Sequence, residues 1–182
     1  IGGLIYKMGM VDSLEVSVTP DSLVSCTVNM LAKGSSTSAG YTASYGAEKK
    51  FVGRNLQFKV ADTVAELTAA STVNLKSLTF TIEKNAEIQA TLSTVQPQDI
   101  INRRFNITGQ IELNYEDRTW LDYVKASGYH AVRIDLINDD TITGAASTKY
   151  QFRLDLSKVE FEGWEPSFAL DDVATQTLNF TA

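Results

Sequence analysis

The most reactive side chains in this sequence are one histidine, His130, and one cysteine, Cys26. A metal site needs several His, Cys or carboxylate ligands that converge on one point, and these two residues form no recognisable ligand spacing. A Cys–His nucleophilic pair depends on closeness in space, which the sequence alone leaves open. Cys26 alternates with Val24, Val28 and Met30 on the apolar side of a predicted strand. We therefore expect a buried, inert thiol at Cys26 and a simple junction residue at His130.

Three carboxylate doublets are the other candidates for chemistry, namely Glu116-Asp117, Asp139-Asp140 and Asp171-Asp172. A glycosidase requires two carboxyl groups that face one cleft, whereas neighbouring residues of a strand point apart. The EF-hand calcium spacing is absent, and so are the G-x-S-x-G, P-loop and dinucleotide-binding glycine patterns. We expect the doublets to cap a helix or to lie in solvated turns. The sequence predicts no enzyme activity, no catalytic residue, no metal and no cofactor.

Composition places the chain among ordinary globular proteins. It has 182 residues, of which 43% are hydrophobic and 21% charged, close to the usual averages. A chain of this size buries enough surface to fold without a disulfide, and one cysteine allows none within the chain. A net charge of −6 argues against a general nucleic-acid binder, although DNA can slide past an acidic surface without adhering.

The ends and the hydropathy of the chain bear on its localisation. No stretch approaches the roughly 20 apolar residues of a membrane-spanning helix, so we expect no membrane partner. The opening segment lacks the features of a signal peptide and reads as a strand entered partway, without an initiator Met. We expect residues upstream of Ile1 to be missing from this sequence.

Alternation of apolar and polar residues along the whole chain is the main structural signal. Segments 11–18 and 23–30 predict a hairpin around the turn from Thr19 to Ser22. A phase change near Lys76-Ser77 predicts a β-bulge, and Gly109 on an apolar face predicts a bend or a close backbone approach. Further apolar sets are Leu56, Phe58 and Val60; Leu78, Phe80 and Ile82; Ile88, Ala90 and Leu92; Phe105, Ile107, Ile111, Leu113 and Tyr115; Val132, Ile134 and Leu136; Tyr150, Phe152, Leu154 and Leu156; Val159 and Phe161; Leu178 and Phe180. About nine strands follow, and they indicate an all-β, mainly antiparallel sandwich or barrel.

One α-helix interrupts the strand pattern. Residues 116–128 place Trp120, Leu121 and Val124 at helical spacing, with an acidic pair for the start and Gly128 for the end. We expect the apolar side of this helix to pack on the sheet. A shorter helix is a weaker prediction for residues 62–70. Loops are predicted at 34–50 and 138–148, and loops of such length are functional or disordered as a rule.

The order of these elements resembles that in phage tail tube proteins. The first hairpin is similar to a family hairpin in which a V-x-S-L-x-L-x-V strand precedes an L-V-x-x-T strand that ends near a G-K-G-like sequence. Residues 73–117 contain a strand of the form S-L-T-F-T-I, a polar turn, an arginine-led strand and an acidic pair that opens a helix. The resemblance is carried by Val11, Ser13, Leu14, Val16, Val18, Leu23, Val24, Thr27, Lys33 and Gly34, and at the end of the chain by Leu156, Val159, Phe161, Pro166, Asp171, Asp172, Gln176, Leu178, Phe180 and Ala182.

This resemblance implies a single tail-tube-like β domain over residues 1–182, lacking an N-terminal part because family members usually begin with further strands. It implies subunits that form rings, commonly of six, which stack into a tube in the virion tail after assembly in the host cytoplasm. DNA and the tape-measure protein would pass through the tube. Tail terminator proteins and baseplate or distal tail proteins would be the other partners.

Two sets of residues are candidates for roles in such a tube. We expect the arm at 34–50 to join one ring to the next, because heterologous contacts that repeat along an axis build filaments. Its contacts would be Tyr41 and Tyr45, together with Lys49 and Lys50 paired with carboxylates of a neighbour. The polar side of the predicted strand at 104–115 is a candidate lining of the lumen, through Gln110, Glu112 and Asn114.

Two other classes of protein remain open. One is a monomeric β-sandwich that binds carbohydrate or a host surface, and the other is a different phage or secretion-system ring protein. A carbohydrate-binding module normally offers an aromatic platform, and neither Trp120 nor Trp164 forms an obvious one in the sequence.

Overall fold

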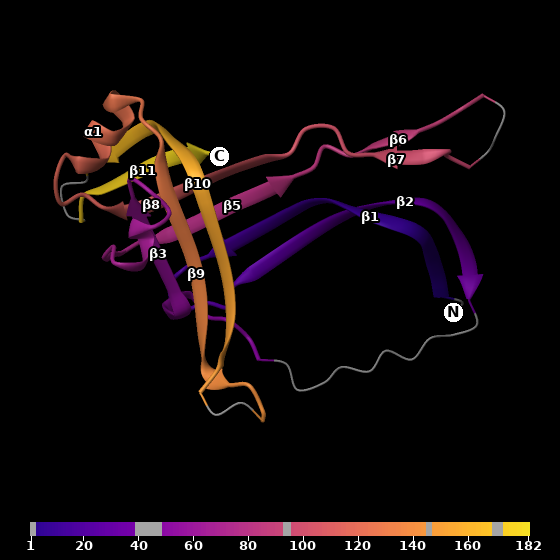
Figure 1. Cartoon of the computed structure of the whole chain (residues 1–182), viewed down its shortest axis with the longest axis horizontal. Helices are drawn as coiled ribbons and strands as arrows, with labels where there is room; N and C mark the ends of the chain where they lie inside the picture. Colours follow the sequence, from indigo (N-terminus) through magenta and orange to yellow (C-terminus); the bar gives the residue numbers. More distant parts are fainter. Residues whose placement is uncertain (1–2, 39–48, 93–95, 145–146, 169–172) are drawn as a thin grey trace. The chain divides into compact units, whose positions relative to one another are not determined.

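The architecture is built almost wholly from strands (Figure 1). The computed structural model describes residues 3–38, 49–92, 96–144, 147–168 and 173–182. Strand residues make up 62% of the structure and helical residues 9%. The predicted all-β class with one α-helix is confirmed.

The described ranges contain eleven strands, one α-helix and two 3-10 helices. In chain order they are β1 Gly3–Val18, β2 Ser25–Ser38, η1 Gly53–Asn55, β3 Leu56–Ala61, η2 Glu66–Thr68, β4 Thr72–Val73, β5 Ser77–Glu83, β6 Glu87–Gln89, β7 Asp99–Ile101, β8 Asn106–Asn114, α1 Thr119–Ala126, β9 His130–Thr141, β10 Lys149–Ser167 and β11 Thr175–Thr181. Nine strands form one sheet in the order β2-β1-β5-β8-β11-β10-β9-β3-β4, and β6 pairs with β7. All pairs with a defined register are antiparallel.

The chain divides into two compact units. The hairpin unit comprises Ile1–Glu15, Cys26–Glu48 and Thr81–Asn106. The core unit comprises Val16–Ser25, Lys49–Phe80 and Ile107–Ala182. Strands β1 and β5 each begin in one unit and end in the other.

The core unit holds nearly all of the buried apolar side chains of the described residues. In β5, β8 and β11 they lie at alternate positions, as the sequence pattern predicts, whereas β9 is buried on both faces. The largest fully buried ones are Phe58, Phe80, Phe180, Leu67, Leu78, Ile111, Ile134 and Leu178. At Gly109 an added Cβ would lie 2.3 Å from Cζ of Phe180. The close approach predicted at this glycine is therefore present, because the ring of Phe180 occupies the space above it.

Helix α1 covers one part of the core unit. Asp117 Oδ1 accepts the backbone N–H of Thr119 at 2.9 Å, so Asp117 holds the first turn, although the N-cap residue is Arg118 and its side chain makes no capping bond. The indole of Trp120 packs edge-on against Phe161 of β10, with ring centroids 5.5 Å apart. The helix ends at Ser127, which adopts the left-handed conformation (φ 48°) expected of Gly128. The predicted helix at 62–70 is wrong in extent, since only the short η2 forms there, around the buried Leu67.

Three other predictions are corrected by the strand bounds. The phase change near Lys76-Ser77 is not a bulge within one strand, because two different strands meet there in the sequence. β4 pairs with β3 at one edge of the sheet, whereas β5 lies between β1 and β8. The predicted loops are shorter than expected: β2 continues to Ser38 and β9 to Thr141, while residues 39–48 lie outside the described part. The two apolar sets at 150–161 belong to one strand, β10, whose register shifts between Leu156 and Val159.

Polar contacts join several segments of the hairpin unit. Asp12 accepts two backbone N–H groups, from Lys84 to its carbonyl at 2.8 Å and from Ala86 to its Oδ1 at 2.7 Å. Asn85 Nδ2 donates to the carbonyl of Arg104 at 2.9 Å. Among the described residues of this unit, Ile100 is the one apolar side chain that is buried. The expected burial of Cys26 is therefore wrong, because no described element covers its side of β2 and the thiol is exposed.

Candidate assembly surfaces

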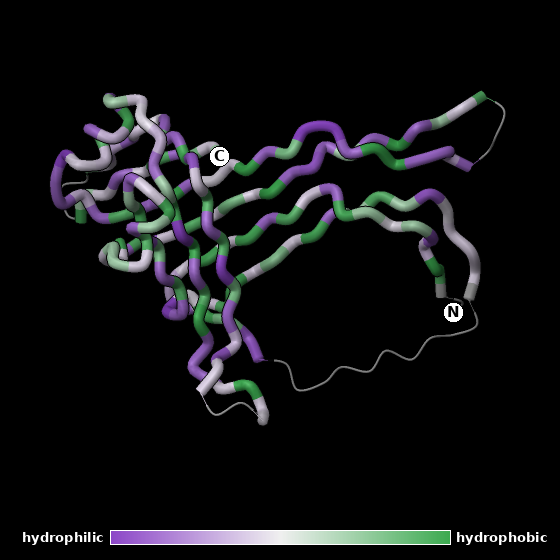
Figure 2. Tube along the Cα trace, in the orientation of Figure 1, coloured by the Kyte–Doolittle hydropathy of each residue, from purple (hydrophilic) through white to green (hydrophobic). Residues whose placement is uncertain are grey.

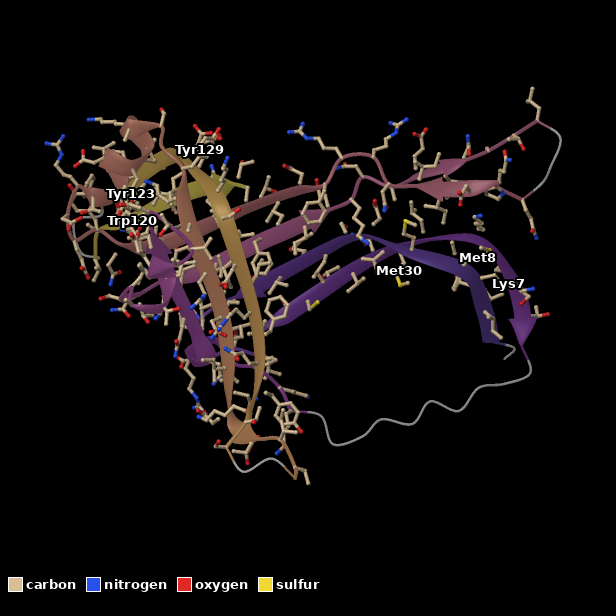
Figure 3. All side chains as sticks on the ribbon, viewed as in Figure 1. Lys7, Met8, Met30, Trp120, Tyr123 and Tyr129 are labelled. Carbon is tan, nitrogen blue, oxygen red and sulfur yellow. The ribbon has the colours of Figure 1, made fainter. Side chains whose placement is uncertain are left out.

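Several large apolar side chains are exposed along the hairpin of β1 and β2, where Figure 2 shows apolar residues recurring on the trace. The exposed fractions are 68% for Tyr6, 71% for Met8 and 61% for Met30, and Figure 3 shows both methionines on the ribbon of this hairpin. The other large apolar side chains exposed on it are Leu4, Ile5, Val11 and Val28. A monomeric protein rarely leaves a contiguous apolar patch uncovered, so such a surface typically marks an interface.

The outer edge of β2 adds unpaired backbone groups to this surface. β2 is the first strand of the sheet order, and within the described sheet its only strand neighbour is β1. Asn29 Nδ2 donates to Oγ of Ser13 at 2.8 Å, so the two strands carry a hydrogen-bonded polar face as well as an apolar one. Natural proteins cover or pair such edges, because an open edge is a template for another strand.

An ion pair fixes the end of β2 against the β6–β7 hairpin inside the same unit. Lys33 Nζ lies 3.1 Å from Asp99 Oδ1 and donates to the carbonyl of Gln98 at 2.7 Å. The hydrogen bond from Lys33, followed by the N–H of Ile100, lowers the pKa of Asp99 below its ordinary value. A second pair joins Arg103 to Glu87. The Lys33 contacts thus join the two hairpins of the unit, whereas the Arg103–Glu87 pair links the two ends of the β6–β7 hairpin.

The polar side of β8 lies opposite the core and is bound to its neighbours by side-chain hydrogen bonds. Gln110 Nε2 donates to Oδ1 of Asn179 on β11 at 3.0 Å. Glu112 accepts from Ser77 Oγ at 3.3 Å and lies 3.8 Å from Nζ of Lys76. Gln110, Glu112 and Asn114, the predicted lumen residues, alternate with the buried Ile111 and Leu113 and therefore share one face. Whether that face lines a lumen stays a prediction.

The root of the predicted arm is anchored in the core unit. The carbonyl of Lys50 accepts a hydrogen bond from Nδ2 of Asn138 at 2.7 Å, and the carbonyl of Phe51 accepts the N–H of Val24 at 3.0 Å. Lys49 Nζ lies 3.0 Å from Oδ2 of Asp140 of its own chain. The side chain of Lys50 is exposed. The other two predicted arm contacts, Tyr41 and Tyr45, lie outside the described residues.

A ladder of opposite charges crosses β9 and β10, and the sequence analysis missed it. In the antiparallel register Arg153 faces Asp135 and Asp155 faces Arg133. Arg133 donates to both carboxylate oxygens of Asp155, at 2.6 and 2.9 Å, and Arg153 donates to Asp135 at 2.8 and 2.9 Å. Gln151 Nε2 donates to both carboxylate oxygens of Asp135, a residue that is only 2% exposed. The sequence pattern that could have indicated this ladder is R-x-D, which occurs at residues 133–135 of β9 and again at residues 153–155 of β10.

Hydrogen bonding within this ladder shifts two ionisation equilibria. The bidentate bond from Arg133 is the main reason that the pKa of Asp155 lies below its ordinary value. The same bond raises the pKa of Arg133. Both groups are therefore ionised at neutral pH, and the ladder is structural because each charge already has its partner.

A cleft of about 360 Å³ opens beside the start of α1 in the core unit. Its apolar part includes Trp120, Tyr123 and Leu113, and its polar part includes the carboxylates of Glu116 and Asp117. The remaining lining residues are Val60, Ser71, Thr72, Val73, Asn74, Asn114, Thr119 and Gln176. The hydrogen bond from Thr119 lowers the pKa of Asp117, so this acidic group stays ionised.

His130 sits at the first position of β9, as the junction prediction has it. Its ring packs on Tyr123 with centroids 4.3 Å apart, and Nδ1 lies 3.4 Å from Oδ1 of Asp62. Neither ring nitrogen makes a hydrogen bond among the described residues.

Across the described residues no three His, Cys, Asp or Glu side chains gather as metal ligands would. No helix in the described ranges is long and apolar enough to span a bilayer.

The chain is an all-β protein, and in its described ranges it leaves a hairpin with exposed apolar side chains and an open strand edge, which are features of an assembly subunit. The phage tail tube protein family model matches residues 2–182, essentially the whole sequence. The chain therefore belongs to the phage tail tube protein family, and its role is structural, in the tail of the virion. No curated protein matches the sequence at a significant level.

Proposed function

We propose that this chain assembles with copies of itself into rings that stack into the tail tube, the conduit for DNA ejection. The observation that carries the proposal is the hairpin unit, which leaves large apolar side chains of β1 and β2 exposed while burying one, Ile100, among its described residues. Strands need an apolar face packed against another element to be stable in water. Covering that apolar face with a neighbouring subunit supplies the missing burial.

Ring formation and stacking use different parts of this surface. Contacts between unlike patches close into a ring when the rotation between subunits closes, and repeated axial contacts extend a filament. The unpaired edge of β2 is available for pairing around a ring. The arm rooted at Lys50 then extends from one ring toward the next, with Tyr41, Tyr45 and the Lys49-Lys50 pair as contacts.

The polar face of β8 is the proposed lining of the lumen. Its exposed side chains are amides and a carboxylate that is paired with Lys76 and Ser77, and neighbouring positions carry hydroxyl groups. Phosphate groups bind to cationic side chains. On this face Lys76 lies beside the Glu112 carboxylate, and the amides and hydroxyl groups around it carry no charge, so DNA has little to adhere to. The tape-measure protein would occupy this lumen before DNA does. Tail terminator and baseplate or distal tail proteins would close the two ends.

Negative-stain microscopy and sedimentation of the purified chain test the proposal. Wild-type protein should form rings or tubes as its concentration rises. Met30→Glu places a charge on the apolar face and should prevent assembly while leaving the secondary structure, measured by circular dichroism, intact. Thr27→Glu is the matched control, because Thr27 is an exposed polar residue on the same strand. Compact monomers at every concentration would refute the proposal and favour a monomeric binding module.

Deletion of residues 36–46 separates stacking from ring closure. If the arm joins successive rings, the deletion variant should stop at single rings, which sedimentation velocity distinguishes from long tubes. Tubes of normal length would show that stacking uses another surface.

A further inference from the structure

The polar face of β8 continues across the sheet to β11 and β10. β11 lies between the other two strands in the core unit (Figure 1). Residues directly opposite each other in an antiparallel pair lie on the same face of the sheet. Gln110 is opposite Asn179, and Asn179 is opposite Glu162, so these three side chains form one row across the face. The other rows are Glu112, Thr177 and Glu165; Thr108, Thr181 and Glu160; and Asn114, Thr175 and Ser167.

A β-bulge at Gly163 brings Glu162 and Glu165 to this same face. Residues three apart in a regular strand point to opposite sides, but between these two glutamates two residues of β10 lie opposite one residue of β11. Gly163 has a φ of 62°, the left-handed conformation of a glycine at a bulge. Trp164 therefore turns to the other side of the strand, where its indole N–H donates to Oε1 of the buried Gln176 at 2.9 Å. With regular alternation after Glu162, Glu165 would instead point into the core.

Side chains in the middle row join the three strands into one surface. Gln110 Nε2 donates to Oδ1 of Asn179 at 3.0 Å. An ideal Cβ at Gly163 would lie 2.9 Å from Nδ2 of Asn179, so this amide lies directly against the bulge. Adjacent strands are about 5 Å apart, which places β10 roughly 10 Å from β8. A passage bordered by the polar face of β8 would therefore be bordered by β10 as well.

The glutamates of β10 carry the uncompensated charge of this surface. Glu112 of β8 lies 3.8 Å from Nζ of Lys76, which offsets its charge. Glu162 and Glu165 are exposed, and within the described part of the chain they have neither an ion-pair nor a hydrogen-bond partner. Every side chain in the four rows is an amide, a hydroxyl group or a carboxylate. Phosphate groups adhere to cations, so these rows offer DNA no charge to bind and two that repel it.

We propose that the lining of the lumen extends from β8 across β11 to β10, and that Glu162 and Glu165 supply its uncompensated negative charge. The proposal rests on the proposed function and deepens it, because it names the side chains that keep passing DNA from adhering.

Size-selective labelling of assembled tubes tests which side of the tube these residues face. The variants Glu162→Cys, Glu165→Cys and Gln110→Cys are made in a Cys26→Ser background. The tubes are treated with N-ethylmaleimide, or with a maleimide attached to a folded protein that is too large to enter them. All three thiols should react with the small reagent and none with the large one. In unassembled subunits both reagents should label each thiol, which shows that the protection arises from assembly.

Charge reversal gives a second readout. Tubes of Glu162→Lys/Glu165→Lys should capture short duplex DNA that resists a nuclease immobilised on beads, because such a nuclease does not reach the lumen. With two added cations per subunit, the affinity should fall at least about tenfold between about 50 and 200 mM salt. Glu116→Lys/Asp122→Lys makes the same change in net charge at two exposed positions outside the four rows. These control tubes should hold no nuclease-resistant DNA.

The outcomes separate this lining from the proposed function. Reaction of Glu162→Cys or Glu165→Cys tubes with the large reagent would overturn the lining assignment. Loss of reaction with both reagents would also overturn it, since it indicates a subunit interface, and so would charge-reversed tubes without nuclease-resistant DNA. In each of these cases tubes form, so the proposed function stands, and labelling decides even if the charge-reversed subunits do not assemble. Wild-type protein that stays monomeric would overturn both proposals.

Discussion

Single residues in this protein decide how closely strands can pack. Gly109 on β8 lies under the ring of Phe180 and 2.8 Å, measured from an ideal Cβ, from the carbonyl oxygen of Thr79. A methyl group there would displace a fully buried ring and a backbone carbonyl. Gly128, two residues beyond α1, has no atom within 4 Å of the same ideal position.

The contrast between these glycines gives a stability prediction. Gly109→Ala should lower the free energy of unfolding by about 1–3 kcal/mol, as overpacking of a core generally does. Gly128→Ala is the control and should stay within about 0.5 kcal/mol of wild type. Urea denaturation followed by tryptophan fluorescence measures both. Equal stabilities of the two variants would contradict the packing around Phe180.

The charge ladder predicts an acid dependence. Arg133 lowers the pKa of Asp155 below its ordinary value of 3.8, so the unfolded chain takes up this proton at a higher pH than the folded chain does. The bond therefore stabilises the folded chain fully at pH values above the ordinary pKa of Asp155. This stabilisation is lost as the pH falls through the lowered pKa of the folded state. Asp155→Asn should therefore flatten the fall in unfolding free energy in acid, while Asp122→Asn should not. An unchanged acid profile in Asp155→Asn would argue against the bond from Arg133.

At the scale of elements, the two faces of β8 have different surroundings: one is packed in the core and the other is polar. The polar face of β8 carries Gln110, Glu112 and Asn114, and the opposite face carries Ile111 and Leu113 in the core. An added cation on the polar face would change what the surface attracts without changing the core.

This difference predicts a DNA-binding gain. Assembled wild-type tubes should bind short duplex DNA weakly, whereas Gln110→Lys/Asn114→Lys tubes should bind it with an affinity that falls steeply as salt rises. Fluorescence anisotropy of labelled DNA measures the affinity. Ala126→Lys, on the exposed side of α1, is the control. If the β8 variant and the control bound DNA equally, β8 would not line the lumen.

Elements were predictable from the sequence where one face of a strand is covered. The alternation around Ile111 and Leu178 and the helical spacing of Trp120 predicted β8, β11 and α1 because all three bury that face. The same alternation predicted a buried Cys26, which is exposed, since periodicity shows which residues share a face and not what covers it. The single-domain prediction for residues 1–182 stays a prediction.

At the scale of the whole molecule, the two units differ in what stabilises them. The core unit is built around buried rings such as Phe58, Phe80 and Phe180, whereas the hairpin unit buries one apolar side chain, Ile100, among its described residues. Segments that bury little apolar surface open more often than a packed core.

Hydrogen exchange should therefore separate the units in the unassembled chain. Amides of β2, β6 and β7 should exchange much faster than amides of β8, β9 and β11, because local opening of the hairpin unit breaks few apolar contacts. Assembly should slow the exchange of β2 selectively, since its edge and apolar face become covered. Mass spectrometry of the free and assembled protein measures both rates. Equal protection of β2 in the two states would refute its place in the interface.

The R-x-D sequence in β9 and β10 has a consequence for how the chain finds its correct pairing. A slip of one residue between strands exposes every core side chain, but a slip of two residues keeps all side chains on their own faces, so hydrophobicity alone does not forbid it. In this strand pair a two-residue slip would bring Asp155 opposite Asp135, or Arg153 opposite Arg133, and like charges directly opposite are destabilising. The repeated triplet therefore favours the native register of β9 and β10. Among shifts by an even number of residues, this register places each arginine opposite an aspartate.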